Sequence, residues 1–324
     1  MSFPSRSQRN RHIPKQRFKV RNWSSYNECL RRRGSLTVWF SNDAIAGWNA
    51  QKRTTRGGQA LYSDLAILAS LTLRSVFHQA LRQTEGLVRS IVQLLGVDLA
   101  VPDYSTLSRR SGTIDVPLPR SRSNRDDPLE LQVDSTGVAF HGAGEWTTEK
   151  HGTKTRKSWR KLHLAIDAET GDIVAVDLTD KETDDASMVA DLLDQIDEPV
   201  GSFMADGAYD TKGVTAAIAE RYPKAAIIVP PIVTAVLSKD AATRPTQRDR
   251  HLLTIRKHGR RGWRKRSGYN RRSRVETMIG RYKKILGEKL RAATFSNQKN
   301  EVRIAAYILN QMTKLGRPDS VRIA

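Results

Sequence analysis

The spacing of apolar residues changes part of the way along the chain, and this change constrains the fold more than any other feature. Between residues 63 and 96 apolar side chains recur every three or four positions, which indicates helices. In the segments between residues 129 and 178 they recur at every second position, which is typical of strands with one buried face. Residues 113–128, with three prolines, separate the two patterns. We therefore expect an all-α region, a linker and a domain built on a sheet.

The all-α region is predicted from its caps and its turn. Ser63 or Asp64 can begin one helix, and Thr84 can begin a second helix that Gly96 ends. Residues 103–110 follow as a short polar helix. This order of helices fits a helix-turn-helix DNA-binding motif, and it fits equally well a small helical bundle with a purely structural role.

The sheet domain combines alternating strands with amphipathic helices. Strands are expected at 129–134, 162–166, 173–178, 203–205 and 225–229, and helices at 183–196, 211–222, 272–286 and 298–314. The second and third strands should form a hairpin. This order predicts an α/β fold with a mixed sheet flanked by helices. The expected organisation is a basic flexible arm at 1–33, the helical region at 34–112, the linker at 113–128 and the sheet domain at 129–324.

Positive charge is concentrated in two segments of a chain whose net charge is +21. Residues 1–33 carry ten Lys or Arg against one Glu, and residues 239–274 carry fourteen against two Asp, which accounts for the whole excess. Such segments attract phosphate backbones, because each neutralised phosphate releases counterions. Nucleic acid is the expected partner. An anionic membrane surface is disfavoured, since the cations lack the regular apolar interleaving of an interfacial helix.

Cysteine content and hydropathy exclude several classes of protein. Cys29 is the single cysteine, so an intramolecular disulfide and a cysteine-rich zinc site are excluded. The longest strongly apolar stretch, residues 65–73, is far shorter than the ~20 residues that a membrane span requires. The cytosol is the expected compartment.

Three carboxylates lie where metal-dependent phosphodiester chemistry needs them. Asp134 ends the alternating stretch of the first strand, Asp206 follows the fourth strand, and Glu276 lies on the helix after the second basic segment. Two divalent ions acting on a phosphodiester need converging carboxylates, and magnesium prefers oxygen ligands. In mixed sheets such sites gather near strand ends. These three residues are the candidate metal ligands.

The helix around Glu276 presents its charged residues on one strip. At about 100° per residue, Tyr269, Arg272, Glu276 and Lys283 fall within about 60° of one another. A carboxylate between two cations is either a surface ion-pair ladder or a metal ligand beside phosphate contacts. Position alone favours the ladder.

The same four residues carry a resemblance to a known family. Their spacing, Y-(2)-R-(3)-E-(6)-K, resembles the signature of DDE transposases of bacterial insertion sequences. Residues 133–137 and 205–210 resemble that family's blocks around its first and second aspartates. Residues 150–152 and 160–167 resemble the insertion-sequence-five group within it.

The resemblance implies a ribonuclease-H-like catalytic domain after an all-α DNA-binding region. In that domain Asp134, Asp206 and Glu276 are implied to bind two Mg²⁺ ions, with Mn²⁺ as a substitute. The implied reaction is cleavage of double-stranded DNA at element ends, followed by attack of the freed 3′-hydroxyl on target DNA. No covalent enzyme intermediate is required.

The resemblance also implies how DNA is held. Tyr269, Arg272 and Lys283 are implied contacts to transposon-end DNA. The basic segment 239–274 is expected to add backbone contacts from Arg260, Arg261, Arg264, Lys265 and Arg266. A homo-oligomer assembled on DNA is expected, because two ends are joined, and the expected location is the bacterial cytoplasm with the nucleoid.

Other titratable residues have simpler interpretations. Asp210 is expected to cap the helix after Asp206, and Asp167 to lie in the hairpin turn. The histidines at 141, 151 and 163 are expected to be packed or solvated. Two functional alternatives stay open: a ribonuclease-H-like nuclease or resolvase that cuts without joining, and a catalytically silent DNA-binding protein descended from a transposase.

Overall fold

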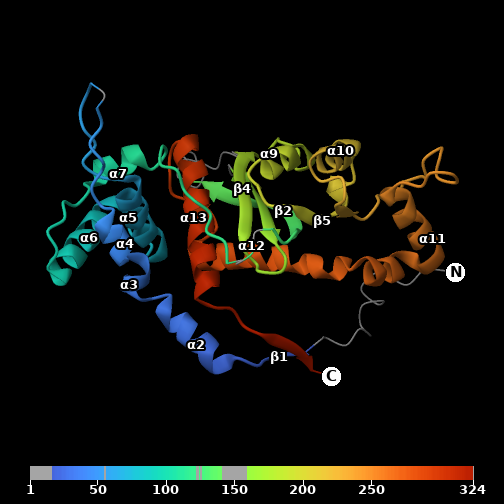
Figure 1. The fold of residues 1–324 in the computed structure, drawn as a ribbon, viewed down its shortest axis with the longest axis horizontal. Coiled ribbons are helices and arrows are strands. Elements are labelled where there is room, and N and C mark those ends of the chain that lie inside the picture. Colours follow the sequence, from blue (N-terminus) through green and yellow to red (C-terminus); the bar gives the residue numbers. More distant parts are fainter. Residues whose placement is uncertain (1–16, 55, 122–123, 125, 141–158, 324) are drawn as a thin grey trace, which may run out of the picture.

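The fold has a central sheet, with helices of the N-terminal half at one end of the molecule and a basic helix at the other (Figure 1). The computed structural model describes residues 17–54, 56–121, 124, 126–140 and 159–323. The residues 150–152 of the family resemblance, and the histidines at 141 and 151, lie outside the described residues. No helix in the described ranges is long and apolar enough to cross a membrane.

The elements in chain order are as follows. The α-helices are α2 (Trp23–Arg32), α3 (Leu36–Trp39), α4 (Asn42–Ala46), α5 (Asp64–Val76), α6 (Leu81–Leu95), α7 (Tyr104–Arg110), α9 (Val189–Leu193), α10 (Lys212–Arg221), α11 (Gln247–Ser267), α12 (Ser273–Leu286) and α13 (Phe295–Leu315). The strands are β1 (Arg17–Val20), β2 (Leu129–Phe140), β3 (Trp159–Asp167), β4 (Ile173–Asp180), β5 (Val200–Met204), β6 (Ala226–Ile228), β7 (Lys289–Leu290) and β8 (Ser320–Ile323).

The main sheet is mixed, as the sequence predicts. Its strands follow the order β4-β3-β2-β5-β6, and β7 pairs with the far end of β2. The pairs β2–β3 and β3–β4 are antiparallel, whereas β2–β5 and β5–β6 are parallel. The β3–β4 hairpin is confirmed, and its turn contains Gly171 at a φ of +74°, which a glycine adopts without strain.

Helices cover both faces of the sheet. Leu131 and Val133 of β2 pack in a core shared with α9 and α10. Leu162 and Leu164 of β3 pack in a second core, shared with α12 and α13. The strands are therefore buried on two faces, where the alternating pattern predicts only one buried face.

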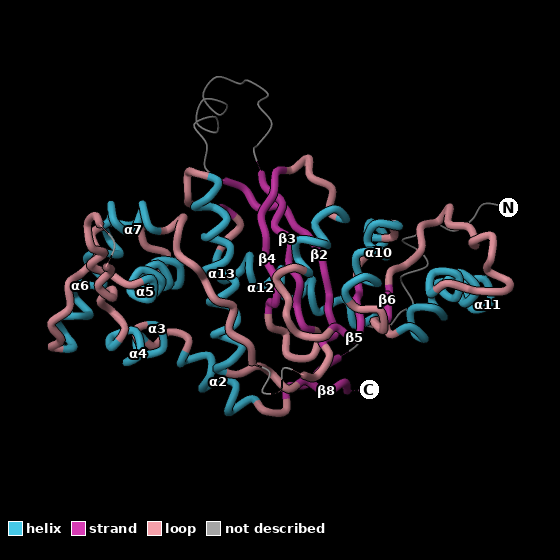
Figure 2. Tube along the Cα trace, turned by 45° about the horizontal axis from the view of Figure 1, so that its top comes forward, coloured by secondary structure: helices cyan, strands magenta, loops and turns pink. Residues whose placement is uncertain are grey.

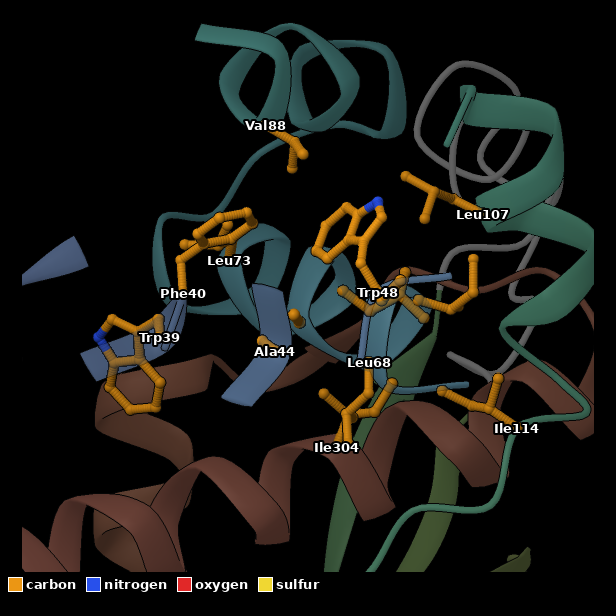
Figure 3. Packing of buried hydrophobic residues seen from close by; sticks show 14 of the residues in the cluster. Trp39, Phe40, Ala44, Trp48, Leu68, Leu73, Val88, Leu107, Ile114 and Ile304 are labelled. Atoms are coloured by element: carbon orange, nitrogen blue, oxygen red, sulfur yellow. The ribbon is translucent and has the colours of Figure 1, made fainter. Parts of the chain in front are cut away.

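Helix α13 belongs to two cores at once. Its residues Ile304 and Ile308 pack with the N-terminal helices, and Figure 3 shows Ile304 beside Leu68 of α5. Val302 and Leu309 of the same helix pack with the sheet and α12. Figure 1 shows α13 standing between these two parts of the molecule.

The N-terminal helices follow the expected order with one error. Ser63 caps α5 by accepting the Ala66 N–H at 3.1 Å, and Gly96 ends α6 in the left-handed conformation. The prediction that Thr84 begins α6 is wrong. The helix starts one turn earlier, at Leu81, and the Thr84 hydroxyl donates back to the Ala80 carbonyl inside the helix.

Residues 17–33, expected to be part of a flexible arm, form β1 and α2. Strand β1 pairs with β8, so the two ends of the described chain lie side by side (Figure 1). The Cys29 thiol donates to the Leu315 carbonyl at 2.8 Å, and Arg33 donates to Gly316. The expectation failed because the partners of this segment lie at the other end of the sequence.

The proline-containing segment after α7 packs against the protein. Ile114 and Val116 are buried with the N-terminal core. The Arg120 guanidinium donates to the carbonyls of Ile173 and Val174 at 2.9 Å and lies 3.3 Å from Glu198. These contacts attach the segment to the edge strand β4.

Candidate active site

The parallel register of β2 and β5 places two aspartates next to each other. Gln132 pairs with Met204, where β5 ends. Asp134 and Asp206 each lie two residues further along, on the same face of the sheet. Strand β2 continues past Asp134 because β3 remains paired with it, so the prediction that Asp134 ends its strand is wrong.

A buried glutamine attaches α12 to β2. The Gln132 amide donates to the Arg271 carbonyl at 2.9 Å and accepts the Val275 N–H at 3.2 Å. Gln132 is only 1% exposed, and a buried amide bonded at both ends fixes the position of its partners. Because Gln132 and Asp134 share a face of β2, the first turn of α12 is held over Asp134.

Three carboxylates converge on one guanidinium. The Arg272 Nη2 atom lies 2.9 Å from Asp134 Oδ2 and 3.7 Å from Asp206 Oδ2. The Arg272 Nη1 atom donates to Glu276 Oε1 at 2.6 Å. The structure thus brings together the three predicted acidic residues and one of the predicted DNA contacts.

The site opens to solvent on the Glu276 side. The Asp134 and Arg272 side chains are each 15% exposed, whereas Asp206 is 41% and Glu276 57% exposed. Asp206 is held at the start of a 3-10 turn, where its Oδ1 accepts the Ala208 N–H at 2.9 Å. The inner part of the site is therefore formed by Asp134 and Arg272, and the outer part by the other two acids.

Burial and charge act against each other at the inner pair. Burial raises the pKa of Asp134, and the Arg272 guanidinium opposes this only in part. Burial alone would lower the pKa of Arg272, but the surrounding carboxylates outweigh it and the pKa is raised. Arg272 is therefore a permanent cation that draws the acids together.

The donor set of the site suits a hard divalent cation. All three candidate ligands are carboxylates, the ligand type that Mg²⁺ prefers, and all three already share one positive group. In the part of the chain that the structure describes, no three His, Cys, Asp or Glu side chains lie at the spacing of a metal site. The cation that the acids share here is the guanidinium.

Two further predicted DNA contacts flank the site. Tyr269 begins the 3-10 turn that leads into α12; its ring packs against Trp263 with centroids 5.2 Å apart. Burial raises the pKa of Tyr269. Lys283 lies two turns beyond Glu276, half-buried, and forms no ion pair with any described residue.

The basic segment forms the long helix α11, which the sequence analysis did not predict. Thr246 and Asp249 begin it with reciprocal hydrogen bonds, and the chain bends at Gly259, where φ is +69°. Beyond the bend only Trp263 is buried, and its indole N–H donates to His251 Nδ1 at 2.9 Å. The predicted DNA contacts are exposed along this stretch: Arg260, Arg261, Arg264, Lys265 and Arg266.

Asp210 does not cap α10, so that prediction is wrong. Thr211 is the cap, since its hydroxyl accepts the Val214 N–H at 3.2 Å. Asp210 instead accepts two hydrogen bonds from Arg248, at 2.8 and 2.9 Å. This pair joins the turn after Asp206 to the first turn of α11.

Sequence reasoning missed Gln132 and set aside His163. The alternation of residues 129–134 predicts that Gln132 faces outward on a half-buried strand, and only the face that it shares with Asp134 points to the site. His163 on β3 is fully buried, with Nε2 2.8 Å from the Thr179 hydroxyl. Its Nδ1 lies 4.0 Å from Asp185 Oδ1, and burial lowers the pKa of the imidazole.

Two family models match the chain, and both are described as a transposase DDE domain. One matches residues 31–143 and the other residues 126–311, which is more than half of the chain. The mixed sheet flanked by helices agrees with the ribonuclease-H-like fold of such domains. The chain therefore belongs to the DDE transposases of insertion-sequence type.

Proposed function

We propose that this transposase cuts double-stranded DNA at the ends of an insertion sequence and joins the freed 3′-hydroxyl to target DNA. One observation carries the proposal: acids from β2, from the turn after β5 and from α12 meet at one guanidinium. A set of convergent carboxylates at a site open to solvent is what phosphodiester chemistry with divalent ions requires.

Asp134, Asp206 and Glu276 are the proposed ligands of two Mg²⁺ ions, or of Mn²⁺ in their place. The support is the chemistry of the donors, three carboxylates with oxygen atoms directed at one cation. When bound, such ions activate the attacking oxygen and stabilise the leaving oxygen of the phosphodiester. The chain itself contributes rigid placement, since Gln132 ties Glu276's helix to Asp134's strand.

Helix α11 is the proposed track for the phosphate backbone. Its exposed cations lie on the segment that leads, through Tyr269, directly to the acids. Arg264 lies over the Tyr269 ring at 5.8 Å, so the cationic surface is continuous with the turn before Arg272. Tyr269, Arg272 and Lys283 are proposed to contact the transposon end beside the site.

The N-terminal helices are proposed to bind the element ends. Figure 2 shows them at the opposite end of the molecule from α11, so one chain offers two separated surfaces to DNA. Joining two ends also requires two copies of the active site near each other, and we propose a homo-oligomer formed on DNA. This work would take place at the nucleoid, in the bacterial cytoplasm.

The direct test replaces Glu276 by Gln, which removes the charge and keeps the shape. The substrate is a labelled duplex of the genomic DNA that flanks the reading frame. We expect Glu276→Gln to abolish cleavage in Mg²⁺ and to leave duplex binding largely intact. The matched control is Glu288→Gln, a change at an exposed residue just beyond α12 that forms no ion pair with the described residues.

The same assay separates the alternatives. Cleavage followed by joining of labelled ends to a target plasmid supports the transposase. Cleavage without joining would instead identify a nuclease or resolvase. Duplex binding without cleavage by the unaltered chain, in Mg²⁺ or in Mn²⁺, would identify a silent DNA-binding protein. Unchanged cleavage by Glu276→Gln would reject the assignment of the site.

A further inference from the structure

We propose that Arg272 competes with the metal ions for the three carboxylates, and that DNA binding withdraws it, so that the site takes up metal only when DNA is engaged. This inference rests on the proposed function, because it concerns the regulation of the same site. It assigns Arg272 two successive partners, first the acids and then a DNA phosphate.

The contacts of Arg272 support the first role. Its two terminal nitrogens contact all three proposed ligands, at 2.9, 3.7 and 2.6 Å. Three converging carboxylates repel one another unless a cation lies among them. With the guanidinium in this position, the same carboxylate oxygens are not free for an ion. Arg272 thus holds the acids together and also occupies their binding capacity.

The Nε–H of Arg272 indicates that the guanidinium has a second favourable position besides the one among the acids. Its Nε–H is buried and has no hydrogen-bond partner among the described residues. A buried N–H without an acceptor is destabilising, so buried polar groups are normally hydrogen-bonded. A second position with more acceptors is therefore favoured once one is offered.

A DNA phosphate offers such a position. A guanidinium binds a phosphate through two parallel hydrogen bonds, and Arg is the residue best suited to this geometry. Arg272 lies at the end of the cationic stretch that begins on α11, in the same 3-10 turn as Tyr269. A backbone held on that stretch comes within reach of the guanidinium from the open, Glu276 side of the site.

In this exchange Arg272 moves from the carboxylates to a phosphate, and divalent ions bind the carboxylates. Every charge stays paired, so the free-energy difference between the two states is small. Before it, a guanidinium is paired with carboxylates and the divalent ions are in water. After it, the guanidinium is paired with phosphate and the ions with the carboxylates. Neither state leaves a buried charge unpaired, the condition that makes a buried ion pair costly to break.

The test measures Mn²⁺ binding by the loss of the electron paramagnetic resonance signal of the free ion. The full-length chain is titrated with and without a short unbroken DNA duplex, and binding to the duplex alone is subtracted. We expect Arg272→Gln without DNA to bind Mn²⁺ roughly tenfold or more tightly than the unaltered chain, since ligands occupied nine-tenths of the time weaken apparent affinity tenfold.

The matched control is Arg271→Gln, which removes the same charge one residue away. Arg271 is paired with Glu130 at 2.7 Å and contacts none of the three acids. We expect its Mn²⁺ affinity to stay within about twofold of that of the unaltered chain, because a partner outside the site acts only through screened, long-range charge. Equal gains in the two variants would reduce the effect to net charge and overturn the proposal.

The titration with duplex can be made on the unaltered chain alone, so it decides the question if Arg272→Gln fails to fold. The duplex should raise the Mn²⁺ affinity of the unaltered chain roughly tenfold. Where Arg272→Gln folds, the duplex should raise its affinity much less. If the duplex leaves the affinity of the unaltered chain unchanged, Arg272 is not withdrawn and the inference fails while the metal site stands. If no Mn²⁺ binds to either chain, with or without duplex, the proposed function itself fails.

Discussion

The side-chain amide of Gln132 accepts a hydrogen bond from the backbone N–H of Val275, at 3.2 Å, and so joins the central strand of the sheet to the helix that carries Glu276. The same amide donates to the Arg271 carbonyl at 2.9 Å. Strand β2 and helix α12 share no backbone ladder. The distance between Asp134 and Glu276 therefore depends on packing, on this amide and on the Arg272 guanidinium that contacts both acids.

Replacing Gln132 by Leu should affect both stability and catalysis. The change leaves the Val275 N–H and the Arg271 carbonyl without their partner, and we expect the free energy of unfolding to fall by about 1–3 kcal/mol. We expect cleavage per folded molecule to fall tenfold or more, because small displacements of catalytic groups have large effects on rate. Urea unfolding and the cleavage assay measure the two effects.

Gln195→Leu is the control for that change. Gln195, two residues past α9, accepts the N–H of Val176 in the edge strand β4 at 3.2 Å. The Gln195→Leu variant should have a lower free energy of unfolding and an unchanged cleavage rate per folded molecule. If both variants lose the same fraction of activity, Gln132 contributes only to folding.

Asp210 and Thr211 allow the capping of α10 to be tested. With Arg248 as its partner, Asp210→Asn should lower the free energy of unfolding by about 1–3 kcal/mol, since a charged hydrogen bond is lost. Thr211→Ala should lower it by about 1 kcal/mol through loss of the cap. Denaturant unfolding measures both. Asn caps helices as well as Asp does, so a neutral Asp210→Asn together with a neutral Thr211→Ala would restore the sequence-based interpretation.

His163 should make stability depend on pH. Burial lowers the pKa of the imidazole in the folded protein below its ordinary value of 6.5. As the pH falls below about 6.5 the unfolded chain takes up a proton that the folded chain refuses, so the free energy of unfolding decreases, by up to about 1.4 kcal/mol per pH unit. Below the folded pKa both states are protonated and the slope from this group vanishes.

His163→Gln should flatten that slope between pH 6.5 and the folded pKa, relative to the unaltered chain. Thermal or urea unfolding across this range provides the measurement. An unchanged slope would mean that the buried ring does not resist protonation.

Cations beyond the bend of α11 should set the salt dependence of DNA binding. Changing Lys265 and Arg266 to Gln removes two exposed charges, and the slope of log Kd against log salt should decrease by about 2. The paired control is Lys212→Gln with Lys224→Gln, two exposed cations on and after α10. Fluorescence anisotropy with a labelled duplex measures the slopes; equal slopes in the two double variants would remove α11 from the DNA path.

Much of the sheet follows from the period of its apolar residues. Strands β2, β3 and β4 each bury regularly spaced side chains, and the pairing of the hairpin is set by a turn with Gly171. Both aspartates could be predicted to lie near each other because each comes directly after a run of apolar strand residues. Their side-by-side placement depends on the parallel register, which the sequence does not contain.

The sequence-based predictions are wrong where a residue has a local structural preference but binds a partner that is distant in the sequence. Asp210 has the residue type and the position of a helix cap, but its partner Arg248 lies 38 residues further along the chain. Helix α11 lacks an apolar stripe, and only the T-x-x-D sequence at Thr246 and Asp249 signals its start. Arg272 was placed beside Glu276 by helical geometry, but its contact with Asp134 requires the packing of α12 on the sheet.

The two-sided packing of α13 has a consequence for how the protein is made. A chain leaves the ribosome from its N-terminus, and early segments normally fold first. Here the N-terminal helices must wait, because Ile304 and Ile308 close their hydrophobic core. Translation that stops after Glu276 would yield a polypeptide without α13. The apolar surfaces that α13 covers on the N-terminal helices and on the sheet would then be exposed, and the polypeptide would be prone to aggregation and proteolysis. The cores of the N-terminal helices and of the sheet are thereby completed together, by the last long helix to be synthesised.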